Sequence, residues 1–196
     1  MKEHVLEQIE EAIQLEEDGY AFYTDRARSV GSGLVKKMFV ALAGDEVRHK
    51  ATFIEMREAL KNKVKFYRPE EIEIRHIPVF PQVSEEFERN KRFERVAIDR
   101  SFGGTTVGDA LSMAMSAERR SIDHYQRILD DTEDLDLIVA LEKIVIEEVV
   151  HLRLLEEQKE FLTENGYWFD PTEFYEYRKV TEKDMREFLR DEGLDI

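Results

Sequence analysis

Two short segments of the sequence place a histidine three residues after a glutamate, Glu46 to His49 and Glu148 to His151. Each glutamate is preceded by another one 30 residues upstream, Glu16 for the first segment and Glu118 for the second. The offset between the two halves is 102 residues at all three positions, so the chain contains the same set of potential metal ligands twice. Four carboxylates and two imidazoles are a suitable ligand set for two divalent ions inside a helical bundle.

The surrounding apolar pattern predicts that these six side chains face a helical core. Residues three and four positions apart share one face of an α-helix, and apolar side chains recur at that spacing on both sides of each candidate ligand. A buried carboxylate without a partner either costs several kcal/mol or becomes protonated. Four carboxylates at similar depth therefore indicate nearby cations.

A hydrogen-bonded polar layer without metal is the alternative for these inward side chains. Two protonated histidines would neutralise at most two of the four carboxylates, whereas two divalent ions supply four positive charges. The charge balance favours two metal ions. Carboxylate and imidazole ligands suit both iron and manganese, so the sequence leaves the identity of the metal open.

Composition restricts the class of protein and its partners. A chain of 196 residues with 42% hydrophobic content can form one domain with a substantial core. The net charge of −15 argues against nucleic acid or an anionic membrane as a partner, because both would be repelled. The sequence begins with polar residues and lacks an apolar run of about 18 residues, so we expect a cytoplasmic protein that does not cross a membrane.

The periodicity predicts an all-α fold whose four bundle helices span about residues 3–30, 34–62, 106–131 and 134–165. Residues 63–105, which contain three of the four prolines, should form a long crossover that returns the chain to start the second helical pair. Within this crossover we expect an extended part at 64–80 and a short helix at 84–100. Residues 1–167 are assigned to the bundle and 168–196 to a C-terminal extension with a short final helix from about Thr181.

The run from Ala12 to Tyr23 and the segment from Asp45 to His49 resemble the rubrerythrin branch of the ferritin-like superfamily. The segment from Glu164 to Phe169 is similar to sequences that follow the last bundle helix there, so the resemblance covers about residues 4–170. It implies a ferritin-like bundle with a di-iron centre that reduces hydrogen peroxide or dioxygen with electrons from a partner protein. It also implies a homodimer, in some members with helices exchanged between subunits.

The same resemblance implies a role for each candidate ligand. Glu46 and Glu148 would bridge the two ions, Glu16 and Glu118 would be terminal ligands, and His49 and His151 would bind one ion each. By the same analogy, Asp45 would orient His151 and Glu147 would orient His49.

Two features depart from the family pattern. Rubrerythrins carry a rubredoxin-like domain that holds iron with cysteines, but this chain has no cysteine, so electrons must come from an external donor protein. Rubrerythrins also carry an additional glutamate one turn after the first in the third helix, where this chain has Arg119 to Ile122. We therefore expect slow peroxide reduction. A ferroxidase, an oxygenase for an organic substrate and a non-redox metal-binding protein remain alternatives.

Two tyrosines are candidates for a catalytic role. Tyr23 and Tyr125 each follow the first glutamate of their half by seven residues, on the same helix face and two turns further along. Each phenol could donate a hydrogen bond to a metal-bound carboxylate, or could be an ordinary core aromatic. His124 lies one position off this stripe, so we expect it at the surface.

Overall fold

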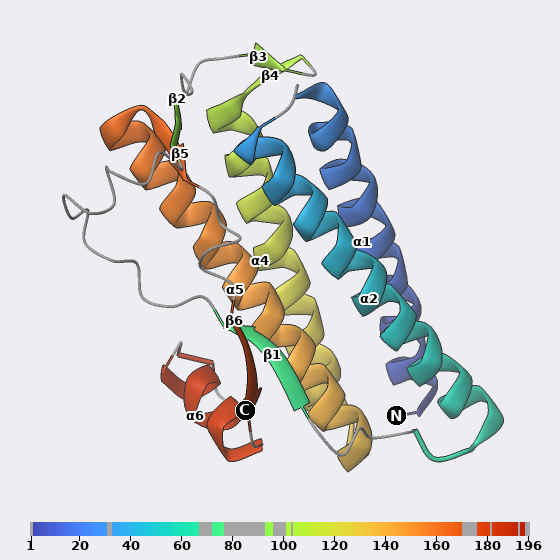
Figure 1. Cartoon of the computed structure of the whole chain (residues 1–196). Coiled ribbons are helices and arrows are strands. Elements are labelled where there is room, and N and C mark those ends of the chain that lie inside the picture. Colours follow the sequence, from blue (N-terminus) through green and yellow to red (C-terminus); the bar gives the residue numbers. More distant parts are fainter. Residues whose placement is uncertain are drawn as a thin grey trace.

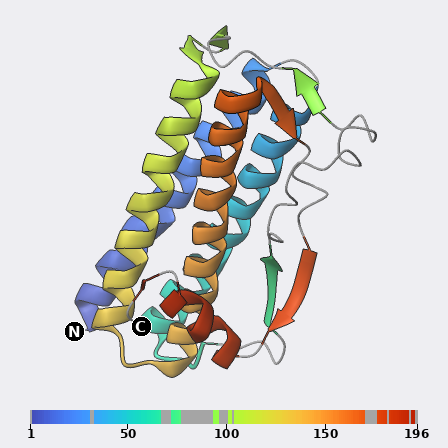
Figure 2. The same ribbon diagram turned by 90° about the vertical axis from the view of Figure 1, so that its left-hand side faces the viewer.

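The computed structural model describes residues 2–30, 33–66, 72–76, 93–95, 101–102, 104–169, 176–180, 182–191 and 193–194. Within these ranges four long helices form a bundle, and short strands and one further helix lie around it (Figures 1 and 2). The bundle helices are α1 (Lys2–Ser29), α2 (Leu34–Asn62), α4 (Val107–Asp131) and α5 (Leu135–Asn165). The predicted four-helix fold is confirmed, and each helix begins and ends within one residue of its predicted bounds.

Local sequence explains where several of these helices begin and end. The Thr106 side chain accepts a hydrogen bond from the backbone N–H of Asp109 and so caps the start of α4. Asp134 caps α5 in the same way by accepting from two backbone N–H groups of its first turn. Gly166 ends α5 with a φ of 69°, a left-handed conformation that glycine adopts without steric cost.

The two helical pairs are antiparallel hairpins joined by the predicted crossover. Helix α2 ends at one end of the bundle and α4 begins at the other, so the chain returns along the length of the bundle between them (Figure 1). Helix α1 packs against α2 and α4, and α5 packs against α4 and α2. The four helices therefore surround one common interior.

Three short antiparallel strand pairs were not predicted. Strand β1 (Ile72–His76) pairs with β6 (Glu176–Val180), β2 (Phe93–Arg95) pairs with β5 (Tyr167–Phe169), and β3 (Ser101–Phe102) pairs with β4 (Thr105–Thr106). The first two pairs join the crossover to the C-terminal part of the chain. Strands β1 and β6 lie side by side outside the bundle (Figure 2).

Two of these strands test the predictions made for the crossover. The extended part expected at 64–80 is a strand at 72–76, whereas the short helix expected at 84–100 is wrong at 93–95. Pairing with β5 explains the difference, because strand formation depends on a distant partner more than on local preference. The remaining residues of 84–100 lie outside the described part of the chain. The domain boundary after residue 167 falls within β5 and stays a prediction.

The last helix, α6 (Glu182–Asp191), begins and ends close to its predicted bounds and is anchored to the bundle. Leu189 is fully buried, and the Arg186 guanidinium lies 3.0 Å from a carboxylate oxygen of Glu142, itself a buried residue of α5. The buried Leu189 and this ion pair therefore help to hold the extension against the bundle.

The core consists of two apolar clusters with a polar layer between them. One cluster includes Ile9 and Phe53, and the other includes Phe39 and Trp168. The histidine expected at the surface, His124, is instead buried at 7% exposure, with Nε2 2.8 Å from the backbone oxygen of Gln8. The N-terminal turns of α1 cover it, and this packing cannot be read from the periodicity of its own helix. None of the described helices is both long and apolar enough to cross a membrane.

Candidate metal centre

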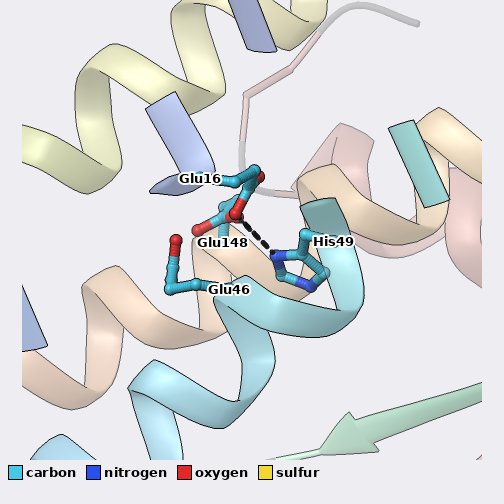
Figure 3. A group of neighbouring side chains, drawn as sticks. All are labelled: Glu16, Glu46, His49 and Glu148. Carbon is cyan, nitrogen blue, oxygen red and sulfur yellow. Dashed lines mark ion pairs between the residues drawn. The ribbon is translucent and has the colours of Figure 1, made fainter. Parts of the chain in front are cut away.

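The six predicted ligands meet in the polar layer between the two apolar clusters, and all six are buried. They form two overlapping groups, and within each group one ligand atom per residue lies within 4.8 Å of the others. The first group is Glu16, Glu46, His49 and Glu148, and the second is Glu46, Glu118, Glu148 and His151. Figure 3 shows the first group, whose side chains come from three helices and turn toward one another. Glu46 and Glu148 belong to both groups, the placement that bridging ligands require.

Several atoms in this layer have no hydrogen-bond partner in the described part of the chain, although all are buried. These atoms are Oε2 of Glu16, Oε1 of Glu46, both carboxylate oxygens of Glu148, and Nδ1 of His49 and His151. Buried polar atoms are nearly always paired, so such a concentration needs an explanation. Oxygen and imidazole nitrogen are suitable ligands for iron or manganese, and the residues fit two such ions.

Glu148 lies between the two imidazole rings. Its Oε1 is 2.8 Å from Nδ1 of His49, and its Oε2 is 3.3 Å from Nδ1 of His151. Neither contact has the angles of a hydrogen bond, since all four atoms remain without a hydrogen-bond partner. The two ring centroids are 5.8 Å apart. Both Nδ1 atoms therefore face the shared carboxylate and the interior of the layer.

The outer nitrogen of each ring is bound by a carboxylate from the opposite half of the chain. Nε2 of His49 lies 2.8 Å from Oε2 of Glu147, and Nε2 of His151 lies 3.1 Å from Oδ2 of Asp45. Partners of this kind fix the orientation of a ligating imidazole and raise its basicity. The geometry fits the pairing that the family resemblance implied.

Both tyrosines also pair across the two halves. The Tyr23 hydroxyl of α1 donates to Oε1 of Glu118 on α4, and the Tyr125 hydroxyl of α4 donates to Oε1 of Glu16 on α1. Both rings are buried, so each hydroxyl depends on its carboxylate for a partner. The two hydrogen bonds hold one oxygen of each carboxylate in a fixed place.

The electrostatics describe how the layer behaves without cations. Burial, reinforced by the nearby charge of Glu148, raises the pKa of both Glu46 and Glu118 well above the usual range. Burial disfavours the charge on His151, but contacts with Asp45 and Glu148 outweigh burial and raise its pKa to about 10. Burial also opposes ionisation of Glu148, yet the neighbouring Glu118 carboxyl and the charge of His49 hold its pKa well below the usual range. Protons thus occupy positions that metal ions would take over.

Gly19 is a site residue that sequence reasoning did not identify. A Cβ atom placed on Gly19 would lie 2.5 Å from Oε2 of Glu46, so the carboxylate occupies space that only glycine leaves open. The equivalent position in the second half, 102 residues later, is Ser121. A glycine inside a long helix costs about 1 kcal/mol relative to alanine. Its presence within the helical pattern was therefore the feature of the sequence that could have indicated a special role.

A cavity of about 320 Å³ lies between α1 and α4 and reaches this layer. Its wall includes Glu46, Glu118 and Tyr23 together with Gly19 and Ser121. Of the two candidate ligands on this wall, Glu118 belongs to the second group and Glu46 belongs to both. A small molecule could therefore approach the centre from the side of α1 and α4.

Four helices that direct four glutamates and two histidines into one buried layer define a ferritin-like carboxylate bundle. The family model that matches is Rubrerythrin, over residues 7–159, and the chain belongs to this family. No curated protein matches the chain.

Two solved structures share the fold. One is a candidate ferritin-like diiron-carboxylate protein from Thermotoga maritima, with 28% sequence identity, a TM-score of 0.56, and coverage of 80% of this chain and 94% of that chain. The other is a hypothetical protein from Pyrococcus furiosus, with 18% identity, a TM-score of 0.57, and coverage of 82% of this chain and 90% of that chain.

Proposed function

We propose that this protein is a di-iron oxidoreductase that reduces hydrogen peroxide or dioxygen with electrons from an external donor protein. The observation that carries the proposal is the pair of overlapping groups of candidate ligands. In each group the Nε2 atom of the histidine contacts a carboxylate, so its Nδ1 atom faces the interior of the layer. Membership of the rubrerythrin family and the likeness to a candidate diiron-carboxylate protein support it.

In this proposal the ligands act as their placement suggests. Glu46 and Glu148 would contribute to holding both ions, because they belong to both groups, and the remaining candidate ligands would divide between the two positions. Glu16 and His49 serve one position, and Glu118 and His151 serve the other. A bound pair of reduced iron ions would supply the two electrons that cleave an O–O bond. Manganese or a mixed pair would suit the same ligands.

The chain's own residues supply orientation and proton positions. Glu147 and Asp45 keep the imidazole Nδ1 atoms pointed into the layer. Tyr23 holds a proton at the Glu118 oxygen beside the cavity, where an incoming oxidant would be close to it. The apolar clusters lie on either side of the layer and limit its contact with water. Electrons come from outside, because the 196 residues include no cysteine that could hold a rubredoxin-like iron.

The test begins with metal content and a single turnover. Protein loaded with iron should contain close to two ions per chain. After chemical reduction it should consume one pulse of hydrogen peroxide or oxygen and then stop, and continued turnover should require an added rubredoxin and its reductase. Glu148→Ala should abolish the pulse, since it removes a residue shared by both ligand groups, whereas Glu160→Ala, on the exposed surface of the same helix, should not.

Two results would contradict the proposal. A folded protein that takes up less than half an equivalent of metal on reconstitution would exclude the di-metal centre. A metal-loaded, reduced protein that stays reduced with both oxidants would leave a structural metal role as the better account. Mass measurement separates the ferroxidase alternative, because a 24-subunit particle supports iron storage and the expected homodimer does not.

A further inference from the structure

The cavity between α1 and α4 is larger than hydrogen peroxide or dioxygen needs. Its volume is about 320 Å³, whereas a water molecule occupies about 30 Å³ and a two-oxygen molecule roughly twice that. Pockets of about 300 Å³ or more are the size that binds organic ligands. The space left beside a bound O–O group would hold a substituent of several carbon atoms.

The walls of this cavity divide into a polar inner end and apolar sides. At the inner end lie the carboxylates of Glu46 and Glu118 and the hydroxyl of Tyr23. Leu15 and Phe22 of α1 and Ala117 of α4, which are all partly exposed, supply apolar surface to its sides. A ligand with one polar oxygen-bearing end and one apolar end matches this arrangement.

The mouth of the cavity indicates which charge such a ligand carries. Asp18 and Arg120, both exposed, line it from the two helices and carry opposite charges. They also occupy equivalent positions in the two halves, 102 residues apart. A mouth with one charge of each sign does not select a net charge, and the overall charge of −15 repels anions. The cavity therefore favours a neutral ligand.

We infer that the cavity seats neutral organic hydroperoxides, with the O–O group at the inner end and the organic substituent against Leu15, Phe22 and Ala117. This inference rests on the proposed function and names a wider substrate class for it. The O–O bond of R–O–O–H breaks, and two electrons from the reduced metal pair enter with two protons taken up from solvent. The products are the alcohol R–OH and one water molecule, so atoms and charges balance.

The first arm of the test compares two oxidants on the reduced, metal-loaded protein. Single-turnover rates are measured with cumene hydroperoxide and with hydrogen peroxide. In Ala117→Phe, whose added ring fills the apolar part of the cavity, the ratio of the cumene hydroperoxide rate to the hydrogen peroxide rate should fall at least tenfold. Ala21→Phe is the matched control, because Ala21 is exposed on α1 and does not line the cavity. Its ratio should equal that of the unchanged protein.

The second arm measures binding without turnover. The alcohol product of cumene hydroperoxide, 2-phenyl-2-propanol, should bind the oxidised, metal-loaded protein at one site per chain in a calorimetric titration. Binding should be lost in Ala117→Phe and retained in Ala21→Phe, with equal metal content in all three proteins as the check on folding. If Ala117→Phe fails that check, Leu15→Ala replaces it, and the enlarged cavity should change the affinity for the alcohol.

The outcomes separate the two proposals. Reaction with hydrogen peroxide together with an unchanged rate ratio in Ala117→Phe, or with no binding of the alcohol, overturns the inference and leaves the proposed function standing. Absence of reaction with both peroxides overturns both. A tenfold fall in the ratio together with lost alcohol binding establishes the cavity as the site for the organic substituent.

Discussion

At the scale of single residues, Gly19 controls where the carboxylate of Glu46 can lie. A methyl group at this position would meet Oε2 of Glu46 at 2.5 Å. The end of a glutamate side chain is flexible, so we expect the carboxylate to move away rather than the helices to separate. The cost should therefore appear in metal binding, because Glu46 is shared by both ligand groups.

Gly19→Ala should accordingly weaken metal binding by on the order of 10- to 100-fold, the usual effect of disturbing the surroundings of a ligand. A competition titration with a chelator and manganese measures it. Gly44→Ala on α2 is the control, because a methyl group there would have nothing within 4 Å. That variant should keep its metal affinity and gain roughly 0.5–1 kcal/mol of unfolding free energy. Equal metal affinity in both variants would show that Gly19 has no such role.

The two tyrosines offer a second comparison at this scale. Both donate to a ligand carboxylate, but Tyr23 lines the cavity and Tyr125 is not among its lining residues. Tyr23→Phe should slow the single turnover with hydrogen peroxide by on the order of a hundredfold without loss of metal. Tyr125→Phe should slow it much less. Stopped-flow absorbance measures both rates, and an equal effect of the two substitutions would refute a special role for Tyr23.

The six candidate ligands and their common buried layer could be predicted from the sequence, because the two halves repeat the same residue types at the same spacing. Two kinds of contact could not be predicted in this way. One is the close approach of Glu46 to Gly19, and the other is the hydrogen bond from each tyrosine to a carboxylate of the other half. These contacts depend on which helices are neighbours and on how they are rotated, and periodicity fixes only the face of each separate helix.

At the scale of elements, α6 illustrates how a short segment is held. Ten residues are too few for a helix that is stable alone in water, so α6 depends on its contacts with the bundle. Leu189 fills an apolar site, and Arg186 provides the only ion pair of buried Glu142 within the described residues. One oxygen of Glu142 already lacks a hydrogen-bond partner there. Removal of the Arg186 side chain would take away the ion-pair partner of the other carboxylate oxygen.

Arg186→Ala should lower the free energy of unfolding by about 1–3 kcal/mol, the cost of leaving a buried polar group unsatisfied. Urea denaturation followed by circular dichroism measures the change. Arg190→Ala, at an exposed position of the same helix, should have little effect. Adding Glu142→Gln to Arg186→Ala should restore part of the loss, because it removes the buried charge. Failure of the double variant to recover would argue for a different cause.

The strand pairs mark the limit of prediction for elements. The helix bounds follow from caps and periodicity, both of which are local. The pairing of Phe93–Arg95 with Tyr167–Phe169 joins segments that are far apart in the chain, and a three-residue strand has no pattern long enough to recognise. Only the position of the crossover relative to α5 determines it.

At the scale of the whole molecule, the buried layer links stability to pH. In the metal-free protein the raised pKa values of His49, His151, Glu46 and Glu118 mean that the folded state retains protons that the unfolded state releases. Stability from these groups is greatest at low pH and is lost as pH rises toward their folded pKa values, about 10 for His151. Glu147 and Glu148 have lowered pKa values and are ionised in both states above about pH 6, so they add no slope there.

Metal-free protein should therefore melt at a progressively lower temperature between about pH 6.5 and pH 9. Protein loaded with manganese, which replaces the protons, should show a smaller decrease, so the difference between the two melting temperatures should widen with pH. Circular dichroism melts at three pH values with and without chelator measure this difference. A gap that stays constant or narrows would mean that these side chains reach solvent in the metal-free state.

The exchange of partners between the two halves has a genetic consequence. A motif present twice suggests redundancy, in which one copy could compensate for damage to the other. Here His49 relies on Glu147, His151 relies on Asp45, and each tyrosine serves the glutamate of the opposite copy. A substitution in one half should therefore also disturb the site residues of the other half. The second copy of the motif therefore does not act as a substitute for the first, and substitutions in the two copies should depend on one another.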